Sequence, residues 1–408
     1  MKFSADKLLR SEDQGFLGKI TVDQESVTQL KECRGLIRQA IINVFLQLSK
    51  SLSKNSENNW VINNDLIPFE LNAVMRSLSN EQKAAIKGLE PKFRGQGSFE
   101  YKTMNKPCHN PPQQIDLDDG VYLPIEVLRE APVVSKNAFF SIIDYTLKKE
   151  AEKYGWKFRP KPTCSRVIIN PTKHIDVPLY AIPKEKYIEL NKHRTMKEAF
   201  SDSTVLNESH LLNSDDIYLA VRDGDHWIKS DPQLISRWFK NAASAEVHGD
   251  RLRRVCRYLK AWRDFQFKKG GPSSITLMAC VVESFDNANK RFKDDSEALM
   301  HCTNQLHDML ANGVKSPIDE TEPDLFPRGI DVEEQNYILK QASHLKHAIK
   351  SALLTAGTTE ETNNILRELF GNRVPLKPDL IKNMASATVL TAPKRTQPDP
   401  HVPNMRAG

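Results

Sequence analysis

The sequence predicts an α+β fold, in which a mixed sheet with flanking helices is followed by a helical domain. In the first half of the chain, short runs rich in β-branched residues alternate with longer amphipathic segments, as in sheets covered by helices. After Asp231-Pro232 the apolar residues recur at helical spacing. We therefore expect two domains and a tail, at 1–231, 232–385 and 386–408.

The first expected helix is long and amphipathic. Its apolar positions recur at helical spacing between Val22 and Lys54, namely at Val27, Leu30, Ile37, Ile41, Val44, Phe45 and Leu48. A helix of this length can serve as a scaffold against which a sheet packs. Shorter helices are expected at 64–77 and 80–87. Ser79, followed three residues later by Gln82, predicts a capping box at the start of the latter.

The expected strands surround one further helix. Strand-like runs lie around Asp116 and at 156–158, 164–169 and 174–181. The helix spans 135–154, with Ser135 as its N-cap and Gly155 as its stop. Residues 186–213 are polar and irregular and indicate a surface insertion, whereas 217–228 indicate a hairpin-like pair of strands.

The second domain is expected to contain a basic helix at 250–269. Apolar residues form a stripe along this helix, and they lie between the basic residues Arg251, Arg253, Arg254, Arg257, Lys260 and Arg263. Gly270-Gly271 ends this helix, and Pro272-Ser273-Ser274 begins the next, where free N–H groups and hydroxyls can bind an anion or a base edge. Further helices are expected at 296–312, 333–355, 360–369 and 378–382.

Three carboxylates are the candidate catalytic residues. Asp116 and Asp118 are two residues apart on one strand, so both point to the same face of the sheet. Asp176 lies on a second strand-like run. Two carboxylates on one strand and a third on a neighbour can hold two Mg²⁺ ions, which activate an attacking hydroxyl and stabilise the leaving oxygen in phosphoryl transfer. Mn²⁺ is an alternative to Mg²⁺ at such a site.

The same aspartates have two other interpretations. Asp119-Gly120 is a turn signal, so the run could be the end of a hairpin. A calcium loop requires glycine at its sixth position, whereas Gly120 is fifth when counted from Asp116, which excludes that motif. Upstream, Gly97-Ser98 can supply a backbone and hydroxyl cradle for phosphates, because glycine permits close approach.

Composition bounds the class of protein. The 408 residues suffice for two domains, and the net charge of +6 suits a basic groove for nucleotides or nucleic acid as well as an ordinary solvated surface. The six cysteines show neither zinc spacing nor a disulfide framework, which favours the cytoplasm. No stretch of eighteen apolar residues is present, so we expect no membrane span.

Several motifs together resemble a known family. Gly97-Ser98 followed by the paired aspartates and Asp176 is similar to the signature of the polymerase-β-like nucleotidyltransferases. The flanking residues resemble the bacterial cGAS/DncV-like nucleotidyltransferases, specifically the DncV-type cyclic GMP-AMP synthases. They are Gln96-Gly97-Ser98-Phe99, Asp116 to Pro124, Gly155 to Phe158, His174 to Pro183, Lys260 to Asp264 and Gly270 to Ile275.

The resemblance implies both an activity and its residues. It implies that ATP and GTP are joined into 3′,3′-cyclic GMP-AMP, a second messenger in bacterial anti-phage (CBASS) defence, at Asp116, Asp118 and Asp176, with Asp176 also placed to act as base. It further implies nucleotide contacts at Gln96, Gly97, Ser98, Arg166, Lys260, Ser273, Ser274 and Asp319. For Arg166 a surface strand arginine, and for Ser274 a helix cap, are the alternatives.

The tail and the choice of substrate leave alternatives open. Residues 391–408 contain four prolines and no apolar periodicity, so we expect disorder there. In the family such a tail can be captured at its terminal glycine, here Gly408, by a ubiquitin-E1/E2-like partner; an inert end is the alternative. Another cyclic di- or oligonucleotide is a possible product. An RNA-binding or RNA-tailing protein is a further hypothesis, although the synthase itself would need no nucleic acid.

Overall fold

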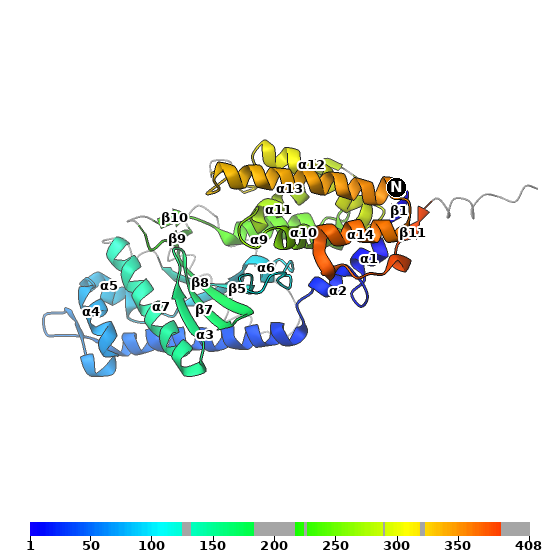
Figure 1. Cartoon of the computed structure of the whole chain (residues 1–408). Helices are drawn as coiled ribbons and strands as arrows, with labels where there is room; N and C mark the ends of the chain where they lie inside the picture. Colours follow the sequence, from blue (N-terminus) through cyan, green and yellow to red (C-terminus); the bar gives the residue numbers. More distant parts are fainter. Residues whose placement is uncertain (125–131, 183–216, 224–226, 289, 319–322, 385–408) are drawn as a thin grey trace, which may run out of the picture.

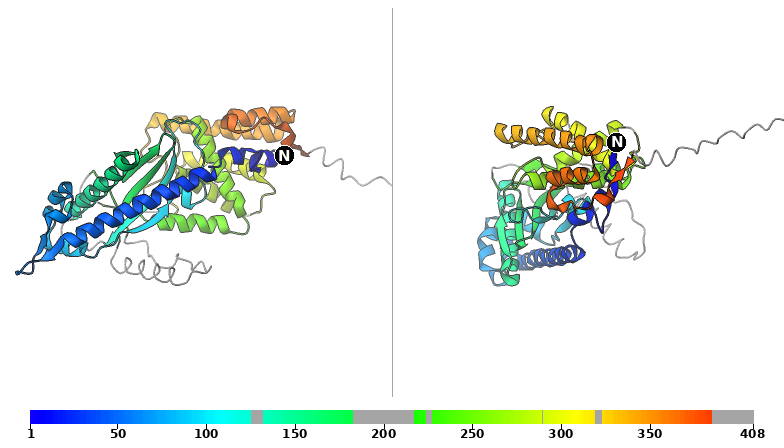
Figure 2. Two further views of the ribbon diagram at one scale, coloured as in Figure 1. Left: turned by 90° about the horizontal axis from the view of Figure 1, so that it is seen from below. Right: turned by 45° about the vertical axis from the view of Figure 1, so that its right-hand side comes forward.

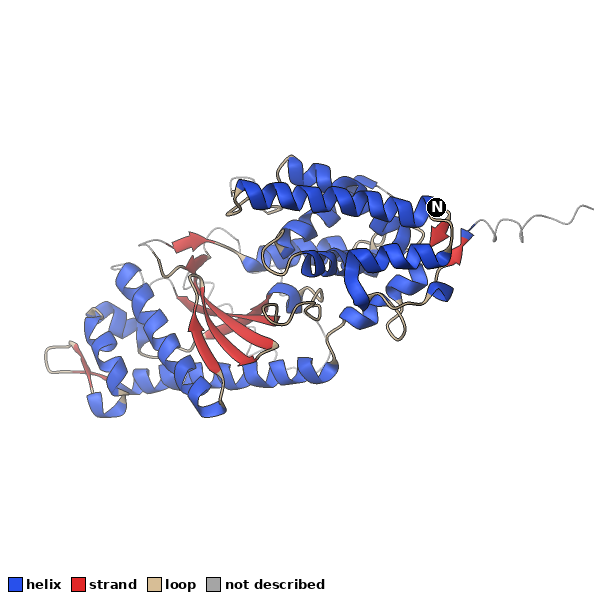
Figure 3. Ribbon diagram, viewed as in Figure 1, coloured by secondary structure: helices blue, strands red, loops and turns tan. Residues whose placement is uncertain are grey.

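The computed structural model describes residues 1–124, 132–182, 217–223, 227–288, 290–318 and 323–384. A seven-stranded sheet with helices packed on it is joined to a domain built mainly from helices, which confirms the predicted fold class (Figures 1 and 3). The predicted insertion at 186–213 and the tail at 386–408 lie outside the described residues. Within those residues, no helix is both long enough and apolar enough to cross a membrane.

The sheet is organised around β8. Its strands are β4 (Lys92–Gln96), β5 (Ile115–Pro124), β6 (Lys157–Pro160), β7 (Cys164–Asn170), β8 (Lys173–Ile182), β9 (Tyr218–Ala220) and β10 (Trp227–Lys229). β8 runs parallel to β5 on one side. On its other side it pairs antiparallel with β7 along its first half and with β9 along its second half. The predicted strands and the hairpin-like pair are therefore confirmed.

The apolar face of the sheet is covered by two long helices, α3 (Gln24–Ser51) and α7 (Pro132–Tyr154) (Figure 2, left). Leu117 of β5 and Ile175 of β8 are fully buried in this core, and burial of each contributes about 2 kcal/mol. The shorter helices are α4 (Phe69–Ser77) and α5 (Asn80–Ile86), and the predicted capping box of Ser79 and Gln82 is present. Because side chains alternate along a strand, the aspartates at even positions point to the opposite face.

Two interpretations of short segments are wrong. Ser135 is not an N-cap, because α7 already begins at Pro132, and proline suits the first helical turn, where its missing N–H is not needed. Asp119-Gly120 is not a turn, because β5 continues through both residues. Gly120 is required there for another reason: a Cβ at this position would lie 2.9 Å from the ring of Tyr180.

The second domain has its own apolar core. Its main helices are α9 (Pro232–Ser244), α10 (Gly249–Gln266), α11 (Ser274–Ala288), α12 (Asp295–Ala311), α13 (Val332–Lys350) and α14 (Thr359–Phe370). The predicted change of pattern at 231–232 coincides with the N-terminus of α9, where the Asp231 carboxylate accepts hydrogen bonds from the Gln233 and Leu234 amides.

The first twenty residues differ from the expected organisation. α1 (Asp6–Arg10) and α2 (Phe16–Ile20) pack in the core of the helical domain, not against the sheet. β1 (Phe3–Ser4) pairs with β11 (Lys382–Asn383), so the predicted helix at 378–382 is only the 3₁₀ turn η7 (Pro378–Leu380) before this strand. We propose that the N-terminal segment belongs to the helical domain and that the boundary at 231 holds for the later chain.

The remaining short elements are β2 (Leu52–Lys54), β3 (Trp60–Ile62), η1 (Asn64–Leu66), α6 (Gly97–Glu100), η5 (Ser351–Thr355) and η6 (Gly371–Arg373).

The proline-containing loop at 105–114 ties the sheet to α10. Asn105 Nδ2 donates to the Arg257 carbonyl at 2.8 Å, and Gln113 Nε2 donates to the carbonyls of Asp264 and Phe267 at 2.8 and 3.0 Å. The loop connects α6 to β5, so these bonds fix the position of the expected phosphate cradle relative to the helical domain.

Asp295 is the centre of a buried ion-pair network that stabilises this domain. Its carboxylate is fully buried and accepts from Arg254 at 2.6 and 2.7 Å, from Arg251 at 3.2 Å and from the Tyr258 hydroxyl at 2.9 Å. Asp295→Ala leaves the arginine charges uncompensated, and should lower the free energy of unfolding by about 4 kcal/mol in urea titrations.

An exposed aspartate of the same helix provides the control. The Asp308 side chain is 63% exposed, so Asp308→Ala should change the free energy of unfolding by less than about 1 kcal/mol. Equal effects of the two substitutions would contradict a structural role for the buried network.

Candidate active site

The four polar side chains of the site come from two adjacent parallel strands. In the register of β5 and β8, Asp116 lies opposite His174, and Asp118 lies opposite Asp176. All four occupy even positions, so they project from the sheet face opposite α3 and α7. The prediction that the three aspartates lie on one face of neighbouring strands is therefore confirmed.

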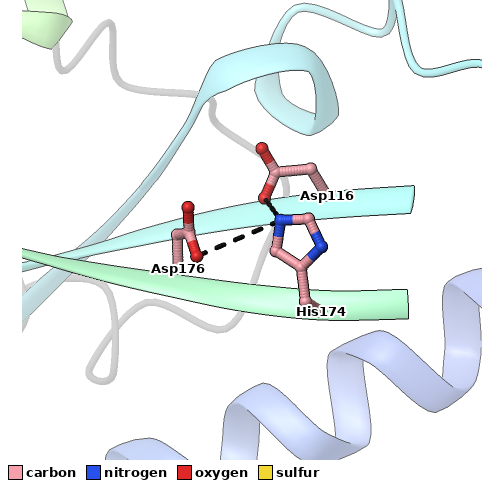
Figure 4. Close-up of side chains that lie close together, drawn as sticks. All are labelled: Asp116, His174 and Asp176. Atoms are coloured by element: carbon pink, nitrogen blue, oxygen red, sulfur yellow. Dashed lines mark ion pairs between the residues drawn. The ribbon is translucent and has the colours of Figure 1, made fainter. Parts of the chain in front are cut away.

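Asp116, His174 and Asp176 form a compact group of potential metal ligands (Figure 4). One ligand atom from each lies within 4.8 Å of the other two. His174 Nε2 lies 2.9 Å from Asp116 Oδ1 and 4.0 Å from Asp176 Oδ1. The Asp116 side chain is 41% exposed and gives solvent access to the group, whereas the other two side chains are almost completely buried.

Asp118 lies beside this group and against Gly97. A Cβ at Gly97 would be 2.0 Å from Asp118 Oδ2, and Gly97 has φ +68°. Burial, together with the charges of Asp116 and Asp176, raises the pKa of the Asp118 carboxyl well above its usual value. A half-buried carboxylate next to two others is costly unless a cation is present, so this arrangement suits a cation site.

Arg166 of β7 is not a surface arginine. Its Nε and Nη2 donate to the two oxygens of Asp176, both at 2.7 Å. The pair follows from the antiparallel register, which places Arg166 opposite Asp176. These two bonds fix the orientation of the Asp176 carboxylate.

The predicted phosphate cradle begins the short helix α6 beside the aspartates. Gln96, on β4, lies opposite Asp118 in the sheet and donates to the Tyr180 hydroxyl at 3.1 Å. The Ser98 carbonyl accepts from the Thr103 amide at 3.0 Å and holds the turn that follows α6. The structure thus brings Gln96 and Gly97 next to the carboxylates.

Lys260 is buried under the cradle. Only 4% of the residue is exposed, and its Nζ donates to the Thr103 carbonyl at 2.7 Å. Burial, assisted by the charge of Arg263, lowers the pKa of the ammonium to about 8. The charge still reaches Asp118, whose carboxyl pKa it lowers against the larger effects of burial and like charge.

Removal of the buried ammonium should change the pH dependence of stability. The cost of burying the charge is present below pH 8 and disappears as the pH rises from about 8 to the unfolded value of 10.5. The free energy of unfolding of the parent, relative to Lys260→Met, should therefore rise by about 3 kcal/mol across this range. Urea titrations at several pH values measure it. Lys315→Met, at a side chain that is 70% exposed, should show no such trend, and a constant difference for Lys260→Met would contradict the burial argument.

Ser273 and Ser274, the predicted nucleotide contacts at the start of α11, form hydrogen bonds within the helical domain. Ser273 Oγ caps α11 by accepting from the Thr276 amide at 3.1 Å, and Ser274 Oγ accepts from Arg263 Nη1 at 3.0 Å. Asp319 and Gly408 lie outside the described residues.

Sequence reasoning did not single out His174 or Gln114 as site residues. His174 precedes Asp176 by two residues, so strand alternation would have placed both on one face. His174 Nδ1 lies 3.1 Å from Gln114 Oε1, a contact between β8 and the residue before β5. Only the parallel register, which is not readable from the sequence, reveals that contact.

Comparisons with known proteins agree with this architecture. Residues 91–180 match the family described as "Cyclic GMP-AMP synthase DncV-like, nucleotidyltransferase domain", and residues 249–383 match "Cyclic GMP-AMP synthase, C-terminal domain". The chain is 33% identical to a cyclic GMP-AMP synthase of Vibrio cholerae, over 92% of each chain. It is 31% identical to a cyclic GMP-AMP synthase of Escherichia coli, over 95% of this chain and 94% of the relative.

Two solved structures are also similar to this chain over nearly its whole length. The Vibrio cholerae DncV cyclic AMP-GMP synthase in complex with the linear intermediate 5′ pppA(3′,5′)pG is similar, with a TM-score of 0.77, 32% identity, and coverage of 94% of this chain and 99% of that one. A variant of the Vibrio enzyme in complex with ATP and GTP has a TM-score of 0.78, 30% identity and the same coverage.

Proposed function

Because the chain belongs to the DncV-like cyclic GMP-AMP synthase family of nucleotidyltransferases, we propose that it joins ATP and GTP into 3′,3′-cyclic GMP-AMP. One observation supports this most strongly. The carboxylates of β5 and β8 lie beside Gly97, in a chain similar to enzymes of this activity over 92% of its length.

The residues of the site suit divalent cations. Asp116, Asp118 and Asp176 would hold two Mg²⁺ ions, with Mn²⁺ as an alternative. When bound, such ions lower the pKa of an attacking hydroxyl and stabilise the leaving oxygen. The fit rests on the chain itself: Asp118 is a half-buried carboxylate beside two like charges, and Asp116 Oδ1 is buried without a hydrogen-bond partner among the described residues.

Each side chain then has a role in binding or proton transfer. Asp176 accepts the proton of the attacking ribose hydroxyl, and the two hydrogen bonds from Arg166 orient its carboxylate for this task. Gln96, Gly97 and Ser98 line the place of the donor triphosphate, where the absent Cβ of Gly97 permits close approach. Lys260 supplies positive charge beneath the same segment.

Two rounds of the same chemistry give a ring. In each round a 3′-hydroxyl attacks an α-phosphate, and pyrophosphate leaves. The Vibrio relative was solved in complex with a linear intermediate, 5′ pppA(3′,5′)pG, and we propose that the same intermediate forms here. The cyclic product would serve as a second messenger in anti-phage defence, made in the cytoplasm, where ATP and GTP are available.

A nucleotide-omission experiment tests the proposal. The purified protein is incubated with Mg²⁺ and ATP, GTP or both, and the products are treated with phosphatase, which leaves a cyclic dinucleotide intact. We expect a resistant product only when both nucleotides are present. A resistant product from one nucleotide alone would indicate another cyclic product. Products that require an RNA primer would identify a tailing polymerase and overturn the proposal.

A further inference from the structure

We propose that His174 is a nitrogen ligand of a divalent transition metal ion at this site, together with Asp116 and Asp176. The inference goes beyond the three carboxylates and rests on the proposed metal-dependent function.

Gln114 fixes which nitrogen of His174 carries the proton. Gln114 Nε2 donates to the carbonyls of Pro171 and Asn170, at 2.9 and 3.3 Å, so the opposite end of the amide must be the oxygen. That oxygen lies 3.1 Å from His174 Nδ1 and can only accept. In the neutral imidazole, which is the form that binds metal ions, the proton is therefore on Nδ1 and Nε2 presents a lone pair.

His174 Nε2 faces the carboxylates of Asp116 and Asp176, whose nearest oxygens lie at 2.9 and 4.0 Å. The His174 side chain is only 7% exposed, and Nε2 is buried without a hydrogen-bond partner among the described residues. Its neighbour at 2.9 Å is Asp116 Oδ1, which likewise lacks a hydrogen-bond partner within the described ranges. Two buried lone pairs that face each other repel, and a cation that both atoms coordinate removes this cost.

The contacts around His174 match those of metal-binding histidines. Such a histidine donates its second ring N–H to an oxygen acceptor, which fixes the tautomer and the orientation of the ring. The Gln114 amide oxygen is that acceptor here. Figure 4 shows Nε2 pointing toward the carboxylates of Asp116 and Asp176.

The donor set predicts a metal preference. Mg²⁺ favours oxygen ligands, whereas affinity for transition metals increases when a carboxylate site gains an imidazole nitrogen. A site formed by two carboxylates and His174 should therefore bind Mn²⁺ more tightly, relative to Mg²⁺, than the same site without the imidazole.

Pulsed electron paramagnetic resonance of bound Mn²⁺ tests the ligand directly. The full chain, without a polyhistidine tag, is loaded with Mn²⁺ and examined for hyperfine coupling to ¹⁴N. We expect this coupling in the parent, and expect it to be replaced by ¹⁵N coupling when the histidines are ¹⁵N-labelled. This arm requires no substitution, so it remains informative if a variant fails to fold.

Substitution of His174 then tests whether this histidine causes the nitrogen coupling, and measures how much it contributes to metal affinity. His174→Leu should abolish the nitrogen coupling and raise the Kd for Mn²⁺ at least about tenfold, while the Kd for Mg²⁺ changes less than about threefold. His307→Leu, at a partly exposed histidine on α12 of the helical domain that contacts Asp308, should change neither.

Three outcomes would overturn the inference. In the first, the unsubstituted protein binds Mn²⁺ and makes the cyclic product but shows no nitrogen coupling. That result would show that His174 only orients Asp116, and it would leave the proposed function intact. Equal losses of Mn²⁺ and Mg²⁺ affinity in His174→Leu lead to the same conclusion. A chain that binds neither ion, alone or with nucleotide, refutes the inference and the proposed function together.

Discussion

Asp118→Asn should lower the rate of dinucleotide synthesis at least about 1,000-fold while the protein remains folded. The substitution preserves the shape of the side chain and removes a charge that the proposed cations would require. Initial rates with ATP, GTP and Mg²⁺ measure the loss. Asp250→Asn, at an aspartate whose side chain is 83% exposed, should retain the parent rate.

Asp118→Asn should raise the stability of the protein in the absence of divalent cations, although it lowers the rate of synthesis. The raised pKa of Asp118 means that the folded protein disfavours its charged form, and this cost grows as the pH rises from the ordinary aspartate range to the raised value. Without divalent cations, Asp118→Asn should therefore have a higher Tm than the parent at neutral pH. Saturating Mg²⁺ should raise the Tm of the parent more than that of the variant.

These thermal shifts distinguish a metal ligand from a structural residue. If Asp118→Asn instead lowers the Tm without cations, and Mg²⁺ stabilises both proteins equally, Asp118 contributes to folding and not to a metal site. Rates and melting curves can be recorded on the same samples, so loss of activity through unfolding would be detected.

Gly97→Ala should lower the rate of synthesis at least about 100-fold. A methyl group at this position would lie 2.0 Å from Asp118 Oδ2, so either the carboxylate or the start of α6 must move. The positive φ adds backbone strain of about 1 kcal/mol. Displacement of a catalytic group by an ångström is sufficient for a loss of this size.

Gly155→Ala is the matched control for Gly97→Ala. Gly155 has φ +69°, nearly equal to that of Gly97, but no atom lies within 4 Å of the Cβ that alanine would add. Both variants carry the same backbone strain, and only Gly97→Ala crowds the carboxylate. Equal losses of activity in the two variants would attribute the effect to backbone strain and contradict the close contact with Asp118.

Strand alternation made the carboxylate site predictable. Asp116 and Asp118 share a face because they are two residues apart, and the buried Leu117 between them identifies which face packs on the helices. The long scaffold helix and the capping box at Ser79 depend on local spacing, and the structure confirms both. The order of Gly97-Ser98, the pair Asp116 and Asp118, and then Asp176 along the chain carried the family resemblance that the comparisons confirm.

Contacts set by strand register were not predictable. Arg166 and Asp176 are opposite each other only because β7 and β8 pair in that register, and the sequence alone favoured a surface arginine. The Gln114–His174 contact depends on the parallel pairing of β5 and β8. The burial of Lys260 depends on the loop that docks on α10, and neither its depth nor its lowered pKa is visible in an amphipathic pattern.

The N-terminal segment shows how distant pairing overrides sequence order. Residues 3–20 precede the scaffold helix, so proximity along the chain assigned them to the catalytic core. They pack instead in the helical domain, and β1 reaches its partner β11 across nearly the whole chain. Two-residue strands have no periodicity that could indicate such a partner.

Mass spectrometry of the nucleotide product tests the central claim most directly. The parent and Asp118→Asn proteins are each incubated with all four nucleoside triphosphates and Mg²⁺, and the products are identified by mass and by digestion with linkage-specific nucleases. We predict that the parent makes a cyclic dinucleotide of one adenosine and one guanosine with two 3′–5′ linkages, and that Asp118→Asn makes none. The same product from both proteins, or only linear products from the parent, would contradict the claim.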